Sequence, residues 1–264
     1  MAWWVKSVIV LLLAWLIVAC SQRITLAPVV QGHYVQNTHS GYYRVKKGDT
    51  LYSIAWSFGK DYRTLARYNH IQSPYDLSPG QKIILAGSAP KRTSSRAKLK
   101  PRPKPQPSKR ISRKKVTLTA RQKHEIVVDA RLDKRRIGHW IWPARGKIIT
   151  RFNPNKANKG INITGKYNSP VRASAAGKVV YSGTGLPAYG KLIIIKHNAR
   201  YLSAYAFNHK LLVHNGQFVK AGQEIATMGR SRSNRVMLHF EIRRTGKPVN
   251  PLRYLPRNIR IKTN

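Results

Sequence analysis

Nine histidines, eight acidic residues and one cysteine are the side chains of this 264-residue chain that are the usual ligands of a zinc ion. After residue 140 the only carboxylates are Glu224 and Glu241, and the only histidines are His197, His209, His214 and His239. A catalytic zinc ion needs three protein ligands and an open position for water. The C-terminal half therefore offers few side chains from which a zinc centre could be built.

His239 lies between Leu238 and Phe240, which predicts a packed histidine rather than a free ligand. His209 follows Phe207 by two residues, so on a regular strand the two side chains would share a face. A relocated metal site around His209 is one interpretation, but no carboxylate accompanies it. The simpler interpretation makes His197, His209 and His214 surface or loop histidines.

The overall charge is the most unusual feature of the composition. Fifty Lys and Arg residues oppose eight acidic ones, which gives a formal net charge of +42. Such a charge predicts anionic partners, either nucleic acid, lipid headgroups, phosphorylated glycans or the carboxylates of peptidoglycan. The single cysteine excludes an intramolecular disulfide, and the 42% apolar content is enough for at least one core.

The N-terminus has the pattern of an export signal. Lys6 precedes an apolar run at residues 8–18, which as a helix would span about 20 Å of a hydrocarbon core of about 30 Å. This length favours a signal peptide over a stable membrane span. An uncleaved anchor with a buried cysteine is the alternative.

Residues 17–20, Ile-Val-Ala-Cys, resemble a bacterial lipobox. The resemblance implies a signal peptide at 1–19, cleavage before Cys20, lipid attachment (including palmitate) to its thiol, and a tether at 20–40. Ser21 in place of aspartate implies an outer-membrane location, facing the periplasm. A protein in that compartment does not meet DNA, so nucleic acid is not an expected partner.

Residues 41–86 have the pattern of a small β-α-α-β module. Apolar side chains at helical spacing predict a helix at 51–58 after Thr50, and Asp61 can cap a second helix that ends at Asn69. Strands are expected at 43–45 and 82–85.

The stretch YRVKKGDTLYSIAWSFGKDYRTLARYN, followed by LSPGQKIIL, closely resembles the LysM glycan-binding module. The resemblance implies a βααβ fold and binding of N-acetylglucosamine-containing peptidoglycan strands in a shallow groove. The implied contact residues are Gly48, Asp49, Thr50, Leu51, Ile71 and Tyr75.

Residues 87–138 predict a basic, Pro-rich linker. Residues 91–123 hold fourteen Lys or Arg and no acidic residue, and prolines alternate with basic residues around 100–107. Such a segment cannot form a core, so disorder is expected. A short basic helix is possible at 121–137. Whether the charge only keeps the spacer solvated or also binds anionic wall or lipid stays open.

Residues 139–264 predict a mainly antiparallel β domain, a sandwich or roll. Short β-rich runs separated by glycine turns occur at 147–152, 178–182, 192–197, 201–207, 224–228 and 237–242. The stretches WPARGKIITRF, YGKLIIIKH and LHFEIRRTGKPVNPLRYLP resemble the lysostaphin-type zinc endopeptidase (LytM) domain over its full length.

The resemblance places the zinc ligands of active members at Asn158, Asn162 and His239. It places the two histidines that assist the water and the oxyanion at Phe207 and Met237. Asparagine is a weak donor for zinc, and Phe and Met cannot transfer a proton. The expectation is a degenerate domain with no catalytic residues, no metal and no other cofactor.

The combination of lipobox, LysM module and degenerate LytM domain resembles the outer-membrane lipoproteins that activate periplasmic N-acetylmuramoyl-L-alanine amidases. The resemblance implies a non-catalytic activator in septal peptidoglycan splitting and daughter-cell separation. The implied amidase surface comprises Asn158, Lys159, Asn162, Tyr205, Phe207, Met237 and His239. A structural peptidoglycan-binding lipoprotein without a regulatory partner and a residual zinc endopeptidase remain alternatives.

Overall fold

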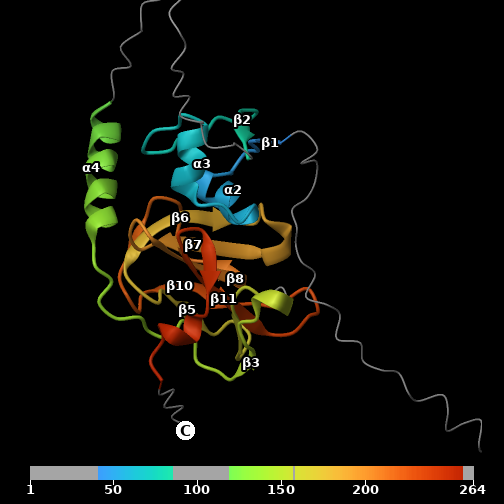
Figure 1. Cartoon of the computed structure of the whole chain (residues 1–264). Coiled ribbons are helices and arrows are strands. Elements are labelled where there is room, and N and C mark those ends of the chain that lie inside the picture. The colour runs from blue at the N-terminus through green and yellow to red at the C-terminus, as the bar shows by residue number, and fades with distance from the viewer. Residues whose placement is uncertain (1–40, 86–118, 157, 258–264) are drawn as a thin grey trace, which may run out of the picture. The chain divides into compact units, whose positions relative to one another are not determined.

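The computed structural model describes residues 41–85, 119–156 and 158–257 (Figure 1). The predicted signal peptide, lipid-attachment cysteine and tether lie outside the described residues, and so does the predicted disorder of residues 87–118. Among the residues described, no helix is long and apolar enough to cross a membrane.

The N-terminal module has the predicted β-α-α-β order. It consists of β1 (Tyr42–Arg44), α2 (Leu51–Ser57), α3 (Tyr62–Tyr68) and β2 (Lys82–Ile84). The two strands pair antiparallel, with Tyr43 opposite Ile83. The predicted LysM fold is confirmed.

Local hydrogen bonds explain where the two helices begin. Thr50 caps α2 in a reciprocal box, since its Oγ1 accepts from the Ser53 amide and Ser53 Oγ accepts from the Thr50 amide. Asp61 caps α3 by accepting from the amides of Arg63 and Thr64. Asp49 instead holds the preceding turn, because its carboxylate accepts from the Tyr43 hydroxyl at 2.7 Å.

Asn69 joins the end of α3 to strand β2. Its Nδ2 donates to the carbonyls of Leu65 at 2.8 Å and Ile84 at 3.0 Å. Its Oδ1 accepts from the Ile84 amide at 2.6 Å. The side chain therefore pairs with Ile84 much as a neighbouring strand would.

Within its described residues, the C-terminal domain has ten strands. They are β3 (Ile148–Thr150), β4 (Ile161–Thr164), β5 (Pro170–Arg172), β6 (Gly177–Gly183), β7 (Lys191–Lys196), β8 (Tyr201–Leu211), β9 (Phe218–Val219), β10 (Glu224–Met228), β11 (Met237–Arg244) and β12 (Lys247–Val249). The six predicted strands correspond to β3, β6, β7, β8, β10 and β11. The sequence patterns missed β4, β5, β9 and β12.

The strands form a mainly antiparallel roll, as predicted. The main sheet has the order β3-β4-β11-β8-β7-β6-β9, and its pairings are antiparallel (Figure 1). Strand β10 pairs with both β8 and β5. Apolar residues of β5 and β10, such as Val171 and Ile225, share one core cluster with Ile193 and Phe240 of the main sheet.

Helix α4 (Ala120–Lys134) lies within the predicted linker and matches the expected basic helix. Its two aspartates form ion pairs with lysines of the main sheet. Asp129 lies 3.3 Å from Lys178 Nζ, and Asp133 lies 2.8 Å from Lys196 Nζ. This end of the linker segment is therefore attached to the C-terminal domain.

Candidate functional site

The strand register places the predicted metal-site residues on one face of the main sheet. His239 of β11 pairs with Asn162 of β4 on one side and with Ala206 of β8 on the other. Two and four residues further along β11, Glu241 and Arg243 point to the same side. We call this side the site face; the opposite side, which carries Ile161, Ile193, Tyr205, Phe240 and Ile242, is the core face.

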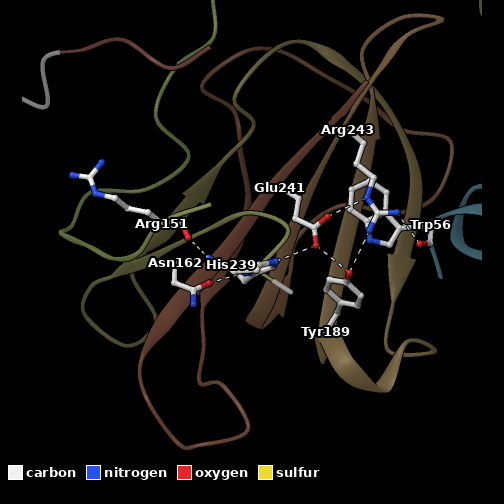
Figure 2. Close-up of polar contacts among 8 residues, drawn as sticks. Trp56, Arg151, Asn162, Tyr189, His239, Glu241 and Arg243 are labelled. Atoms are coloured by element: carbon white, nitrogen blue, oxygen red, sulfur yellow. Dashed lines mark hydrogen bonds and ion pairs between the residues drawn. The ribbon is translucent and has the colours of Figure 1, made fainter. Parts of the chain in front are cut away.

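A continuous chain of polar contacts runs along β11 (Figure 2). His239 Nδ1 lies 2.7 Å from Asn162 Oδ1, and its Nε2 lies 3.1 Å from Glu241 Oε1. Arg243 Nε donates to Glu241 Oε2 at 3.1 Å. The Tyr189 hydroxyl, from the 3-10 turn η4 (Pro187–Tyr189), donates to Glu241 Oε1 at 3.0 Å.

Glu241 is the charge centre of this chain and is only 1% exposed. Burial alone would raise the pKa of its carboxyl group. The Arg243 guanidinium and the hydrogen bonds from His239 and Tyr189 outweigh burial and lower the pKa of Glu241 to about 2. The carboxylate is therefore ionised and fully engaged at neutral pH.

Phe207 and Met237 occupy the positions of the assisting histidines, as expected. The Phe207 ring centroid lies 6.2 Å from that of His239, and the Phe207 backbone has a positive φ of 63°. A register shift between β7 and β8, between the pairs Lys191–Asn208 and Ile193–Tyr205, spans this position. Met237 is 8% exposed and precedes His239 by two residues on the same face.

The side chains on the site face do not fit a catalytic zinc ion. Both ring nitrogens of His239 are engaged by Asn162 and Glu241. Asn158 Nδ2 donates to the Arg151 carbonyl, and Asn158 Oδ1 is buried with no hydrogen-bond partner among the described residues. One neutral amide oxygen is a weak zinc donor. No group of three His, Cys, Asp or Glu side chains in the described ranges could hold a metal.

Two of the predicted partner-surface residues differ in where they lie. Lys159 is half-buried, and burial and then the Arg243 charge lower the pKa of its amine, so it borders the site face. The prediction that Tyr205 lies on the partner surface is wrong, because its side chain is fully buried on the core face. Its hydroxyl accepts from the Ser174 amide at 2.8 Å, because residue 205 of β8 alternates with the site-face residues 204 and 206.

His197 is also not the surface histidine that the sequence favoured. It is fully buried, and its Nδ1–H must donate to the Ala176 carbonyl at 3.0 Å, since a carbonyl can only accept. Burial, followed by the Arg135 charge, lowers the pKa of His197 to about 4 despite the Ala176 bond. His209, in contrast, is part-exposed and hydrogen-bonded to the Tyr167 hydroxyl.

The predicted glycan residues cluster only in part. Tyr75 is half-buried, and its ring centroid lies 6.0 Å from that of Tyr52, which follows the Gly48–Leu51 segment directly. Ile71 is half-buried and Gly48 is exposed. The Leu51 side chain is fully buried in the module core, so only its backbone could reach a sugar.

Sequence reasoning missed Glu241 and Arg243 as members of the site. Their signal was present in the alternation His239-x-Glu241-x-Arg243, which on a strand puts three polar side chains on one face. Alternation of polar residues ordinarily indicates a solvated face. Here, however, Glu241 and Arg243 are each 1% exposed.

Comparisons with known proteins agree with this architecture. Residues 43–86 match the LysM domain model, and residues 156–251 match the model of peptidase family M23. One solved structure, a zinc-containing peptidase from Vibrio cholerae, is 30% identical with a TM-score of 0.38, covering 42% of this chain and 37% of that one.

Two curated relatives align over most of the chain. A "Lipoprotein NlpD/LppB homolog" of Pseudomonas aeruginosa is 46% identical over 83% of this chain and 78% of its own length. "Murein hydrolase activator NlpD" of Escherichia coli is 40% identical over 85% of this chain and 70% of its own length. With that identity over more than two thirds of these relatives, the chain belongs to the NlpD family of lipoproteins.

Proposed function

We propose that this chain activates periplasmic N-acetylmuramoyl-L-alanine amidases and does not itself cut peptidoglycan. The observation that carries the proposal is the site face, where a peptidase-like sheet is retained but both His239 nitrogens are engaged within the protein. Phe207 and Met237 cannot shuttle a proton or donate to an oxyanion. Related chains named murein hydrolase activator support the same function.

The site face would act on the amidase by a shift of population. An activator favours the active conformation only if it binds that conformation more tightly than the inactive one. A difference of about 3 kcal/mol corresponds to roughly 100-fold activation. Asn158, Lys159, Asn162, Phe207, Met237 and His239 are the residues of this chain proposed to line the contact.

The LysM module and the lipid would set the location of the activator. Tyr75 and the exposed Gly48 turn are proposed to bind glycan strands, and acylated Cys20 is proposed to anchor the chain in the outer membrane. Two weak tethers at the wall raise the effective concentration of the activator without new contacts.

The test measures dye release from labelled sacculi by the mature chain, with and without a cognate amidase and with and without added zinc. We expect no release by the chain alone under either condition, and release above that of the amidase alone when the two are mixed. Intrinsic zinc-dependent release would instead favour a residual endopeptidase. Wall binding with no effect on any amidase would favour a structural lipoprotein.

A further inference from the structure

Helix α2 is buried on all sides, although the LysM module is too small to cover it. Six consecutive residues, 51–56, are at most 6% exposed. A surface helix normally buries one stripe, and Leu51, Ile54 and Ala55 form that stripe toward the module core. Tyr52 and Trp56 lie outside the stripe. Tyr52 is partly covered by Tyr62 and Tyr75 of the same module, whereas Trp56 is covered by another part of the chain.

The cover of Trp56 is Arg243 of the site face (Figure 2). The Arg243 guanidinium carbon lies 3.5 Å from the centroid of the Trp56 ring, and Nη1 donates to the Trp56 carbonyl at 2.7 Å. Trp56 is in the last turn of α2, where its carbonyl also accepts from the Gly59 amide at 3.2 Å and where a cation is favoured. Arg243 therefore both stacks on the helix and caps it.

Lys196 makes a second contact with the same module. Its side chain is fully buried, and its Nζ lies 5.6 Å from the Tyr62 ring centroid and 6.0 Å from that of Tyr52. Apolar site-face residues belong to the same core cluster as the LysM residues; they are Tyr181, Leu192, Ile194, Leu202, Ala204 and Ala206. Without the module, these side chains and the Arg243 guanidinium would lose this cover, and Lys196 would keep only its ion pair with Asp133 of α4.

The turn after β11 makes a third contact. A Cβ atom built on Gly246 would lie 2.6 Å from the Asp61 amide nitrogen and 2.7 Å from the Lys60 carbonyl carbon. Only glycine permits so close an approach of the two backbones. The hydroxyl of Tyr62, the residue after Asp61, is buried with no hydrogen-bond partner among the described residues, and this cost favours a contact that can open.

We propose that the LysM module is an internal occupant of the site face, so that a partner can bind there only after α2 leaves. The part of the site face around Arg243, Ala204 and Ala206, which continues along β11 and β8 from His239, is then closed in the resting chain. The apparent affinity for a partner is lowered by the fraction of molecules that are open. The identity of that partner rests on the proposed function; the closure itself does not.

The test opens the contact with a wedge in the full mature chain. Gly246→Asn places a side chain against Lys60 and Asp61, and asparagine tolerates the positive φ of 77° at this position. Gly216→Asn is the matched control, since Gly216 has a φ of 85° and open space around it. Trp56→Ala opens the same contact from the LysM side.

The readout is modification of lysines by an amine-reactive reagent, followed by mass spectrometry. We expect Lys196 to be protected in the wild type and in Gly216→Asn, and to react about tenfold faster in Gly246→Asn and Trp56→Ala. Exposed Lys82 is the internal reference. Hydrogen exchange of the β11 amides checks that the C-terminal domain stays folded. Equal reaction of Lys196 and Lys82 in the wild type overturns the closure.

A second readout separates this proposal from the proposed function. The two opened variants are expected to reach half-maximal amidase activation at a lower concentration than the wild type and Gly216→Asn. Opening without that shift overturns the claim that closure controls access to the partner. A failure of all four proteins to activate any amidase overturns the proposed function and leaves the lysine result standing.

Discussion

Tyr205, Ser203 and His197 form a buried polar cluster behind the site face. Ser203 Oγ lies 3.0 Å from Tyr205 Oη and 2.7 Å from His197 Nε2, and the Ser174 amide donates to Tyr205 Oη. Each polar group has a partner within the core, so removal of one leaves another unsatisfied in a medium where water cannot replace it.

Tyr205→Phe is therefore expected to destabilise the chain without touching the partner surface. Loss of the hydroxyl leaves the buried Ser174 amide unpaired, at a cost of about 1–3 kcal/mol in the free energy of unfolding measured in urea. Tyr167→Phe, at a 47% exposed tyrosine, is the control and should change it by less than about 0.5 kcal/mol. Loss of amidase activation by folded Tyr205→Phe would contradict its placement on the core face.

His197 predicts a loss of stability in mild acid. Its pKa is about 4 in the folded chain and near 6.5 when unfolded, so the unfolded state takes up the proton first as pH falls. Stability is complete above pH 6.5 and decreases by about 3 kcal/mol down to pH 4. Glu241, with its pKa lowered to about 2, adds a further loss between about pH 4.5 and 2.

The measurement is the unfolding free energy in urea across this pH range. His197→Asn should be less stable at pH 7 but should have a flatter profile between pH 6.5 and 4.5. His214→Asn, at an exposed histidine, should keep the wild-type slope. An unchanged slope in His197→Asn would show that the acid sensitivity comes from another group.

Residue positions were predictable from the sequence where a motif fixed them and not where packing did. Asn162, Phe207, Met237 and His239 were predicted from motif positions to lie together. They do lie on one face, because the pairing of the strands fixes the motif positions relative to one another. Tyr205 was misplaced because the alternation along β8 was not applied to it. Arg243 is covered by a helix that lies 187 residues away in sequence, which no local pattern reports.

At the scale of the secondary-structure element, the ends of helix α3 could be predicted from the capping residues. Asp61 and Asn69 were read as helix ends from their side-chain chemistry alone, and the structure confirms both. Strands β5 and β12 were missed because each has three residues of which one is proline, and β9 was missed because it has only two residues.

Asn69→Ala tests whether one side chain completes the two-stranded sheet of the LysM module. The variant loses bonds to both backbone groups of Ile84, so we expect the module to lose about 1–2 kcal/mol of stability. Amide exchange at Ile84 should accelerate, while the Val45 amide, which donates to Gln81, keeps its protection. Gln72→Ala, at an exposed residue of the following loop, is the control.

At the scale of the whole molecule, the order of the modules could be predicted from composition. The contact between the LysM module and the C-terminal domain could not. The basic linker gave no indication of a contact between the modules that it joins, whereas Arg243 and Lys196 contact the LysM module. A contact of this kind arises from surface complementarity between distant segments and leaves no periodic signal in either one.

Cys20→Ala is expected to move the chain off the outer membrane while its activation of an amidase in solution is unchanged. Without the thiol there is no acylation, and acyl chains contribute about 0.8 kcal/mol per buried CH₂ to membrane binding. Fractionation of membranes and the dye-release assay measure the two effects. Ser21→Ala, next to the attachment site, should retain the anchored wild-type distribution. Membrane retention of Cys20→Ala would contradict the lipobox interpretation.

The charge of +42 and the LysM module should make separable contributions to wall binding. Coulombic attraction between exposed charges is screened within about 8–10 Å at physiological salt, whereas sugar recognition rests on hydrogen bonds and apolar contact. Retention of the full chain on purified sacculi should therefore fall with salt and then reach a plateau.

Tyr75→Asn removes the aromatic wall proposed for the sugar but keeps a residue type that tolerates the φ of 68° at this position. It should abolish the plateau and leave the low-salt binding nearly unchanged. Tyr42→Ala, at the half-buried tyrosine whose ring faces Lys82, should keep both components. If binding of the wild type vanishes entirely above about a few tenths molar salt, the LysM module does not bind sugar, and the chain attaches to peptidoglycan by charge alone.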